Sequence, residues 1–469
     1  MRQRALLGLV LALIIAFAAG FFFRDSLGGA LCQAGGPCLA AAAPTATPPP
    51  TATDEPAPTD EPAPTDEPTA EPAPTDEPES TSTPKPTATP RPPLTAELRE
   101  EVFNDVWQTV KEHYLYPDYN GVNWDEMREI FKPQADAALS DDDFYTVLAS
   151  MVEKLADEHS RFAPPEEARE EDALSSGTDT YVGIGILSNH EPGAALVTLV
   201  FADSPALEAG IERGDRIIAV NGQPFTGTDS IRGPEGSEVR LTVRAPQAEP
   251  RELTLVRRPV LGHIVPSSKR LPGNPAIGYL LVPSLWADDM HTQVISQLIQ
   301  LRQQDPPLRG LVMDLRANGG GWRNVLEGIL SQFVSGDVGD FYSQGDAYPL
   351  DIKPGAEFEH YDALPLVILV DGGSASYAEV LAGSLQFAGA TVIGVPSAGN
   401  TETIFQYNFD DDSRLWVAQE GFKLPNGTDF EGSGVQPDIV VQEDWSQFAL
   451  PNDPAILRAV EVINQQAGR

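Results

Sequence analysis

Two glycine-rich turns contain the side chains and backbone groups that could do chemistry. The first, Val370-Asp-Gly-Gly-Ser-Ala-Ser-Tyr-Ala-Glu379, places Ser374 and Ser376 between a continuous apolar run and a predicted helix. A serine at a helix N-terminus lies in the field of unpaired N–H groups, which favours developing negative charge. This position suits a nucleophile, but serines also cap helices there for structural reasons alone.

The second turn, Asp314-Leu-Arg-Ala-Asn-Gly-Gly-Gly321, follows another apolar run. Three consecutive glycines let a ligand approach the backbone closely, and their amides could stabilise the oxyanion of an acyl-transfer reaction. A phosphate-binding loop is the alternative, although the turn lacks the lysine of a P-loop. The net charge of -38 argues against nucleic acid and anionic lipid surfaces as partners.

Residues 261–469, which include both turns, alternate continuous apolar segments with amphipathic ones. We expect strands at residues 276–282, 310–315, 365–370 and 391–394, and helices around 294–301, 325–333 and 376–387. This alternation predicts an α/β fold whose largely parallel sheet is covered on both faces. Sites in such sheets form outside the carboxyl ends of the strands, where both turns fall.

The preceding sequence divides into two pieces that differ in pattern. Residues 94–176 read as helices: apolar residues recur every four positions from Leu98 to Val110, and Ser140 followed by Asp143 marks the start of another helix. Residues 177–260 instead contain short β-rich runs separated by turn residues. We therefore predict an N-terminal helical region and a separate small β-barrel.

The first 93 residues predict a membrane anchor followed by a disordered linker. Ala5–Phe23 is a run of 19 residues without a charge, preceded by Arg2 and Arg4. We assign residues 1–30 to an anchor that keeps the N-terminus in the cytoplasm and exports the rest, with a cleaved signal peptide as the alternative. Residues 31–93, rich in Pro, Thr and acidic residues, cannot bury a core. The expected location is the cell membrane, single-pass, with the catalytic part outside.

The segment Ser204-Pro-Ala-Leu-Glu-Ala-Gly-Ile-Glu-Arg-Gly-Asp-Arg-Ile-Ile-Ala-Val-Asn-Gly222 resembles the PDZ domain found within exported proteases. The resemblance implies that a peptide adds as an extra strand while the amides of one loop bind its terminal carboxylate. By position, that peptide-binding loop consists of Tyr181, Val182, Gly183, Ile184 and Gly185. A β-barrel without a ligand is the alternative.

Together with the two turns and the late Glu431-Gly-Ser-Gly-Val-Gln-Pro-Asp438, this segment makes the chain similar to the carboxyl-terminal processing, or tail-specific, serine peptidases. The resemblance runs from about Leu94 to Val441. It implies that Ser376 is the nucleophile. The implied oxyanion donors are a glycine amide, Gly320 or Gly321, and the amide of Tyr377.

One position departs from that family. Its general base is a lysine about 25 residues after the serine, and here Asn400 holds the place. An amide cannot accept a proton near neutral pH, and the later Lys423 lies in a predicted strand. In a related branch resembling tricorn-type proteases the base is a histidine from ahead of the core. By that analogy His159 deprotonates Ser376, and Glu402 or Glu379 orients it.

These observations predict a membrane-anchored extracytoplasmic serine endopeptidase that captures polypeptide C-termini and cleaves peptide bonds through Ser376. Its partners would be polypeptides with free C-termini and the membrane, and it would need no metal and no organic cofactor. A catalytically inactive, protease-like scaffold that binds peptides is the alternative, since the usual lysine is replaced. The sequence gives no prediction of the oligomeric state.

Overall fold

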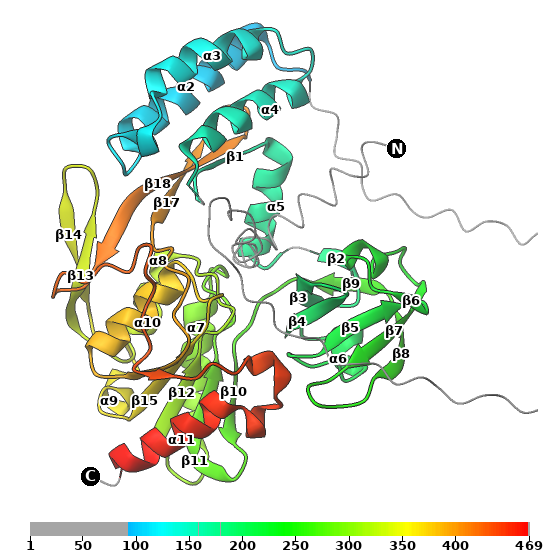
Figure 1. Ribbon diagram of the computed structural model, residues 1–469, viewed down its shortest axis with the longest axis vertical. Helices are drawn as coiled ribbons and strands as arrows, with labels where there is room; N and C mark the ends of the chain where they lie inside the picture. The colour runs from blue at the N-terminus through cyan, green and yellow to red at the C-terminus, as the bar shows by residue number, and fades with distance from the viewer. Residues whose placement is uncertain (1–91, 158, 179, 468–469) are drawn as a thin grey trace, which may run out of the picture. The chain divides into compact units, whose positions relative to one another are not determined.

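The computed structural model describes residues 92–467 except residues 158 and 179 (Figure 1). The predicted membrane anchor and nearly all of the predicted linker lie outside the described residues. Of the helices within the described range, none combines the length and the apolar character that crossing a bilayer requires.

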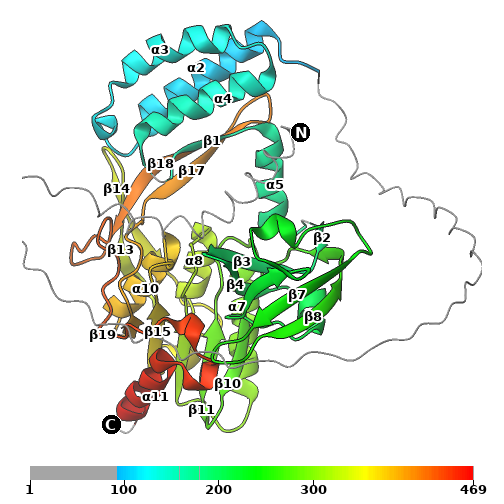
Figure 2. The same ribbon diagram turned by 45° about the vertical axis from the view of Figure 1, so that its right-hand side comes forward.

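Three helices open the described chain: α2 (Ala96–His113), α3 (Trp124–Asp136) and α4 (Asp141–Val152). Side chains cap all three, since Thr95 accepts from the Leu98 amide at 3.2 Å, Asn123 from the Glu126 amide at 3.4 Å and Ser140 from the Asp143 amide at 3.0 Å. The apolar faces of the three helices share one core with residues of β18 (Arg414–Lys423). Both views show these helices lying along that strand (Figure 2). A short strand, β1 (Arg161–Ala163), and α5 (Pro165–Ser175) follow.

The next part contains the PDZ-like strands. They are β2 (Thr180–Gly183), β3 (Ile186–Glu191), β4 (Ala194–Val200), β5 (Arg216–Val220), β6 (Gln223–Pro224), β7 (Glu238–Arg244), β8 (Arg251–Val256) and β9 (Arg258–Leu261). The main sheet has the order β3-β4-β5-β7-β8, and β2 pairs with β9. The single-turn α6 (Pro205–Glu208) begins at Ser204, whose hydroxyl accepts from the Leu207 amide at 3.1 Å. Within the described residues β3 pairs only with β4, so no strand is paired with its other edge.

The predicted parallel sheet is confirmed, with six strands in the order β10-β11-β12-β15-β16-β19. Its strands are β10 (Ser267–Leu271), β11 (Asn274–Leu281), β12 (Gly310–Asp314), β15 (Leu366–Val370), β16 (Thr391–Gly394) and β19 (Ile439–Val440). All pairings except β10 with β11 are parallel. The helices that pack on it are α7 (Met290–Gln303), α8 (Arg323–Leu330), α10 (Tyr377–Phe387) and α11 (Pro454–Ala467). The first three share one core with the sheet and α11 shares another, so both faces are covered.

A second, antiparallel sheet was not predicted. It joins β1, β18, β13 (Gly336–Tyr342) and β14 (Ala347–Ile352), and β17 (Thr403–Asn408) also pairs with β18. The prediction of only a largely parallel core was therefore incomplete. The signal is weak because β13 reads Gly-Asp-Val-Gly-Asp-Phe-Tyr, with two glycines and two aspartates in seven residues. After β14 the chain forms the short α9 (Phe358–Tyr361) before it enters β15.

Two arginines of the PDZ-like part contact residues that follow strands of the parallel sheet. Arg213 donates to the Arg316 carbonyl at 2.9 Å, and its guanidinium lies 3.7 Å from the centre of the Trp445 ring. Arg216 donates to the carbonyl of Ser446 at 2.8 Å. Trp445 in turn donates through Nε1 to Asp371 Oδ2 at 2.8 Å, next to the first glycine-rich turn.

Candidate active site

Ser376 occupies a strained backbone position at the start of α10. Its φ of 55° and ψ of -131° lie in a sparsely populated region for a residue other than glycine, a strain that typically costs about 1–3 kcal/mol. Its amide donates to the Asn400 carbonyl at 2.7 Å and to Glu379 Oε2 at 3.0 Å, and these bonds hold the strained turn. Ser374, the other candidate hydroxyl, is fully buried and donates to the Leu315 carbonyl at 2.8 Å. Of the two serines, Ser376 is the one that lines a cavity.

The Glu379 carboxylate connects the serine turn to the turn that contains Asn400. Besides the Ser376 amide, it accepts hydrogen bonds from Ser397 Oγ at 2.6 Å, the Gly399 amide at 2.7 Å and the Asn400 amide at 2.9 Å. Glu379 is 0% exposed, and burial raises its pKa while these donors oppose the shift. The carboxylate therefore braces the backbone behind Ser376. The alternative in which Glu379 orients His159 finds no support in these contacts.

The triple-glycine turn lies directly against Ser376. At Gly320, which has φ of 89°, an added Cβ would lie 2.7 Å from Ser376 Cβ and 3.0 Å from the Tyr377 nitrogen. At Gly321 an added Cβ would collide with the backbone of Leu285. Neither position can hold a side chain without displacing the backbone beside it, which is a physical reason for two consecutive glycines here.

The two predicted glycine donors differ in their hydrogen bonding. The Gly320 amide already donates to Asn318 Oδ1 at 2.9 Å. Among the described residues, neither the Gly321 amide nor the Tyr377 amide donates a hydrogen bond. Both residues line the same cavity as Ser376. Of the two glycines left open by the sequence, the geometry therefore favours Gly321 as the partner of Tyr377.

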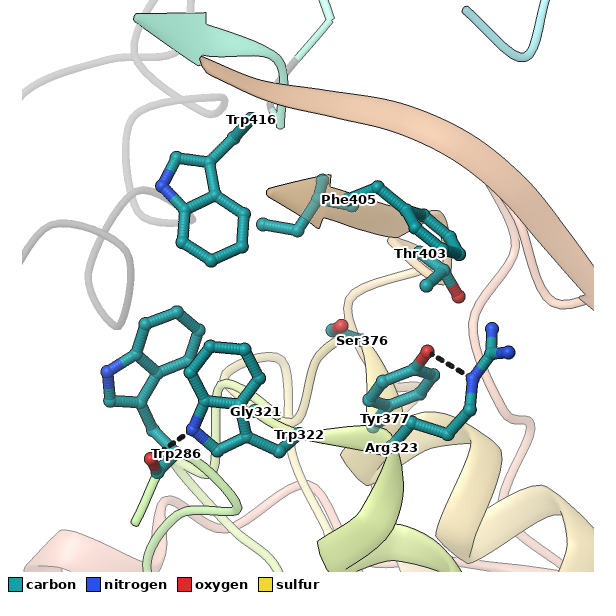
Figure 3. Close-up of a pocket in the computed structure, with 10 residues that line it drawn as sticks. Trp286, Gly321, Trp322, Arg323, Ser376, Tyr377, Thr403, Phe405 and Trp416 are labelled. Carbon is teal, nitrogen blue, oxygen red and sulfur yellow. Dashed lines mark hydrogen bonds between the residues drawn. The ribbon is translucent and has the colours of Figure 1, made fainter. Parts of the chain in front are cut away.

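The cavity at Ser376 has a volume of about 210 Å³ and is lined mainly by aromatic side chains. Figure 3 shows Ser376 between the rings of Trp286, Trp322 and Trp416 on one side and Thr403, Tyr377 and Arg323 on the other. Gly321, Ile404 and Phe405 complete the lining. Arg323 Nε donates a hydrogen bond of 3.1 Å to the Tyr377 hydroxyl, and this bond holds the two side chains at the polar side of the cavity.

His159 and Glu402 are brought together from distant parts of the chain. His159 Nε2 lies 3.6 Å from Glu402 Oε2, and both side chains are buried. Burial lowers the pKa of His159 to about 4, although the charge of Asp157 opposes the shift, so the imidazole is neutral at pH 7. Tyr116, which the sequence did not point to, donates to Glu402 Oε1 through its hydroxyl. Burial raises the pKa of that hydroxyl, so Tyr116 stays protonated and remains a donor.

The segment Asn400–Glu402 links this pair to the serine turn. The Asn400 carbonyl accepts from the Ser376 amide, and the Glu402 carboxylate faces His159. Because only one residue lies between them, the Cα atoms of Asn400 and Glu402 are no more than about 7 Å apart. Between them, the Thr401 amide donates to Glu431 Oε2 at 2.7 Å.

Lys423 and three further histidines contact other side chains. Lys423 ends β18, with Nζ 5.6 Å from the centre of the Tyr342 ring, and its backbone pairs with Asp340. Three further histidines have other neighbours: His113 stacks on Tyr407, His190 lies against Phe225, and His263 lies 3.2 Å from Asp289. The described residues contain no group of three or more His, Cys, Asp or Glu side chains arranged for a metal ion. The expectation that no metal or cofactor is needed stays a prediction.

Of the predicted peptide-binding loop, Tyr181, Val182 and Gly183 form part of β2 and pair with β9. Ile184 and Gly185 alone lie between β2 and β3. The carbonyl of Ile184 accepts from the Ala206 amide, and the carbonyl of Gly185 accepts from the Phe201 amide. Peptide capture at this loop remains a prediction.

Sequence reasoning missed the aromatic lining and Tyr116. Trp286, Trp322, Trp416 and Tyr116 come from four separate segments, and nothing in the local sequence around them signals that they meet. Trp416 reaches the cavity at Ser376 because it lies in β18, which pairs with β1 and β17.

Comparison with known proteins identifies three stretches of the chain. Residues 95–153 match the Tricorn protease C1 domain, residues 196–245 match the PDZ domain, and residues 276–441 match peptidase family S41. The photosystem II D1 C-terminal processing protease, a solved structure, superposes with a TM-score of 0.52 at 24% identity, covering 78% of this chain and 97% of that one. This likeness shows a shared fold.

Two relatives are more similar in sequence. A carboxy-terminal-processing protease of Bartonella bacilliformis is 31% identical over 303 residues, which cover 61% of this chain and 67% of that protein. The chloroplastic carboxyl-terminal-processing peptidase 2 of Arabidopsis thaliana is 30% identical over 370 residues, covering 74% and 70%. With its PDZ and Tricorn C1 segments, the chain belongs to the carboxyl-terminal processing serine peptidases of family S41.

Proposed function

We propose that the chain is a membrane-anchored extracytoplasmic serine endopeptidase in which Ser376 attacks the peptide bond. The observation that carries this proposal is the strained position of Ser376 against the triple-glycine turn, with two amides that have no acceptor among the described residues on the same cavity. Amides aimed at a developing oxyanion are among the largest contributions to acyl-transfer catalysis, about 100- to 1000-fold each.

The proposed reaction proceeds through an acyl-enzyme. Ser376 Oγ attacks the carbonyl carbon, and the Gly321 and Tyr377 amides donate to the oxygen as it becomes negative. Collapse of the tetrahedral intermediate breaks the C–N bond, and the leaving amine takes the proton that the serine lost. Water then attacks the ester and restores the Ser376 hydroxyl.

His159 is the proposed base, with Asn400 in the place of the family's usual lysine. Its low pKa supports this role because the imidazole is neutral, and able to accept a proton, across the neutral range. Once protonated it would face the buried Glu402 carboxylate, which Tyr116 holds in place. Glu402 would then stabilise the imidazolium, as the third member of a serine–histidine–acid set does.

The PDZ-like part supplies substrate capture in this proposal. The unpaired edge of β3 offers backbone hydrogen bonds to the C-terminal residues of a polypeptide, which would add as a further strand. The loop up to Gly185 offers amides to the terminal carboxylate. The N-terminal apolar run would anchor the enzyme with its catalytic part outside the cytoplasm.

Cleavage of an unfolded protein by Ser376→Ala, compared with the wild type, tests the nucleophile. Ser384→Ala is the matched control, because this serine lies in the same helix, is buried, and its hydroxyl has no hydrogen-bond partner among the described residues. We expect no cleavage and no fluorophosphonate labelling for Ser376→Ala, and wild-type behaviour for the control. Equal cleavage by both variants would remove Ser376 from the reaction.

The base is tested by His159→Ala beside Asn400→Lys. Loss of activity in the first, with no gain in the second, supports histidine. Activity retained by His159→Ala and raised in Asn400→Lys would return the role to a lysine. The alternative of an inactive scaffold predicts peptide-tail binding without any labelling of the wild-type serine.

A further inference from the structure

We infer that the cavity beside Ser376 is a subsite for a large aromatic side chain, so that the enzyme cleaves after phenylalanine-like or tyrosine-like residues. This inference rests on the proposed function and names the substrate class of the same site. A residue whose carbonyl oxygen meets the Gly321 and Tyr377 amides has its side chain one carbon away, and Gly321 and Tyr377 line the cavity together with Ser376. That side chain therefore has this cavity as its nearest space.

The size of the cavity fits a ring. An apolar cavity of about 150 Å³ in a protein interior is enough to hold benzene, and this one has about 210 Å³. A methyl group would leave most of that space without contacts, because dispersion and burial both scale with the surface that touches.

The chemistry of the wall also fits a ring. Trp286 and Trp322 stack with their centroids 4.6 Å apart, and Trp416 lies 5.8 Å from the first and 6.1 Å from the second. Aromatic pairs are most favourable at centroid separations of about 4.5–7 Å. A substrate ring that enters beside these tryptophans and Phe405 extends an arrangement already at the preferred spacing (Figure 3).

Hydrogen bonds hold the tryptophans in position before any substrate arrives. Trp322 Nε1 donates to the Trp286 carbonyl at 2.7 Å and to Ser175 Oγ at 2.9 Å, while Trp416 Nε1 donates to Glu171 Oε2 at 3.1 Å. Both acceptor side chains come from α5, so this helix fixes the wall from behind. A subsite that is rigid before binding loses less entropy when it closes on a ligand.

The lining offers no unpaired charged group to a charged substrate side chain. Arg323 is the one charged residue among those that line the cavity, and its guanidinium is paired with Glu420 and lies 3.8 Å from the centre of the Phe341 ring. A lysine or arginine side chain would approach this cation without a carboxylate in the lining. A glutamate would have to compete with Glu420, which is already buried against Arg323.

The experiment uses the full chain and internally quenched peptides of one sequence in which only the residue before the cleaved bond varies: Phe, Tyr, Leu, Ala, Lys or Glu. We expect kcat/KM for Phe and Tyr to exceed that for Ala by at least about 10-fold, since burying a ring contributes more than burying a methyl group. In Trp286→Leu the Phe-to-Ala ratio should fall by about 3- to 10-fold through the lost ring contact. Phe387→Leu, an exposed phenylalanine at the far end of α10, is the matched control and should keep the wild-type ratio.

Each other outcome is decisive. Ser376-dependent cleavage that prefers Ala over Phe overturns the aromatic subsite and leaves the proposed function standing. A Phe preference that survives unchanged in Trp286→Leu removes the subsite from this cavity. Peptidyl phosphonates that differ only in a benzyl or a methyl side chain test the subsite and the proposed function separately. Labelling of Ser376 by either probe supports the nucleophile, and faster labelling by the benzyl probe supports the aromatic subsite. If Ser376 is not labelled by either probe and no peptide is cleaved, the proposed function fails together with the inference.

Discussion

Replacing Glu379 by glutamine should loosen the turn that holds Ser376, the proposed nucleophile. Each carboxylate oxygen of Glu379 accepts from two donors, Ser397 Oγ and the Gly399 amide at one oxygen and the Ser376 and Asn400 amides at the other. If Oε2 becomes NH₂, that group faces the Ser376 and Asn400 amides and both hydrogen bonds are lost; if Oε1 does, Ser397 Oγ can accept from it and only the Gly399 bond is lost. At about 1.5–3 kcal/mol for a bond to a charged group, losing one or two bonds costs about 1.5–6 kcal/mol.

Hydrogen–deuterium exchange is the assay that localises this effect. Amides of residues 374–402 should exchange faster in Glu379→Gln at pH 7, while the urea midpoint of unfolding and the cleavage rate both fall. Glu129→Gln, an exposed glutamate on α3, is the control and should change stability by less than about 0.5 kcal/mol. Unchanged exchange across residues 374–402, with a free energy of unfolding within about 1 kcal/mol of the wild type, would refute the bracing role of this carboxylate.

Three further predictions follow from the same geometry. Gly320→Ala should lower kcat by about 100-fold or more, since the new Cβ displaces Ser376, which lies 2.7 Å away; near-normal kcat would show that the turn can move aside. Because burial lowers the pKa of His159 to about 4, this proposed base stays neutral as pH falls, so the acid limb of kcat/KM should lie below pH 6.5 and activity should vanish as pH falls through about 4. An acid limb at or above 6.5 in the pH profile contradicts this. Trp445→Phe keeps the ring under Arg213 but removes the Nε1 donor to an aspartate, so urea unfolding should show a loss of about 1–3 kcal/mol; no loss would show that this bond contributes nothing net.

The parallel core could be predicted because its strands are short apolar runs bounded by glycine turns. The runs ending at Asp314 and Val370 are buried on both faces, so no polar alternation obscures them. The serine turn followed from the same logic, since it comes where such a run meets a helix. Its strain did not, because a φ of 55° at Ser376 arises from the Asn400 and Glu379 bonds rather than from the local residue types.

The surroundings of the serine depend on contacts that no local pattern encodes. His159 meets Glu402 across 243 positions of the chain, at 3.6 Å. The sequence analysis paired these residues through a resemblance to other proteases, and spacing alone gives no hint of the pair. A strand was predicted around Lys423, but its partners β1, β13 and β17 come from distant parts of the chain, so the antiparallel sheet and the three tryptophans at the cavity were missed.

The contacts of Arg213 and Arg216 bear on how the protein can be truncated. A shortened enzyme without residues 180–261 would lose Arg213, which stacks on Trp445 and lies 3.8 Å from the fully buried Asp314, and Arg216, which donates to the Ser446 carbonyl. Its new surface would expose an indole and a backbone oxygen that the intact chain covers. A minimal catalytic fragment would therefore need compensating substitutions at this seam, and cutting at the strand boundaries alone should give a poorly soluble product.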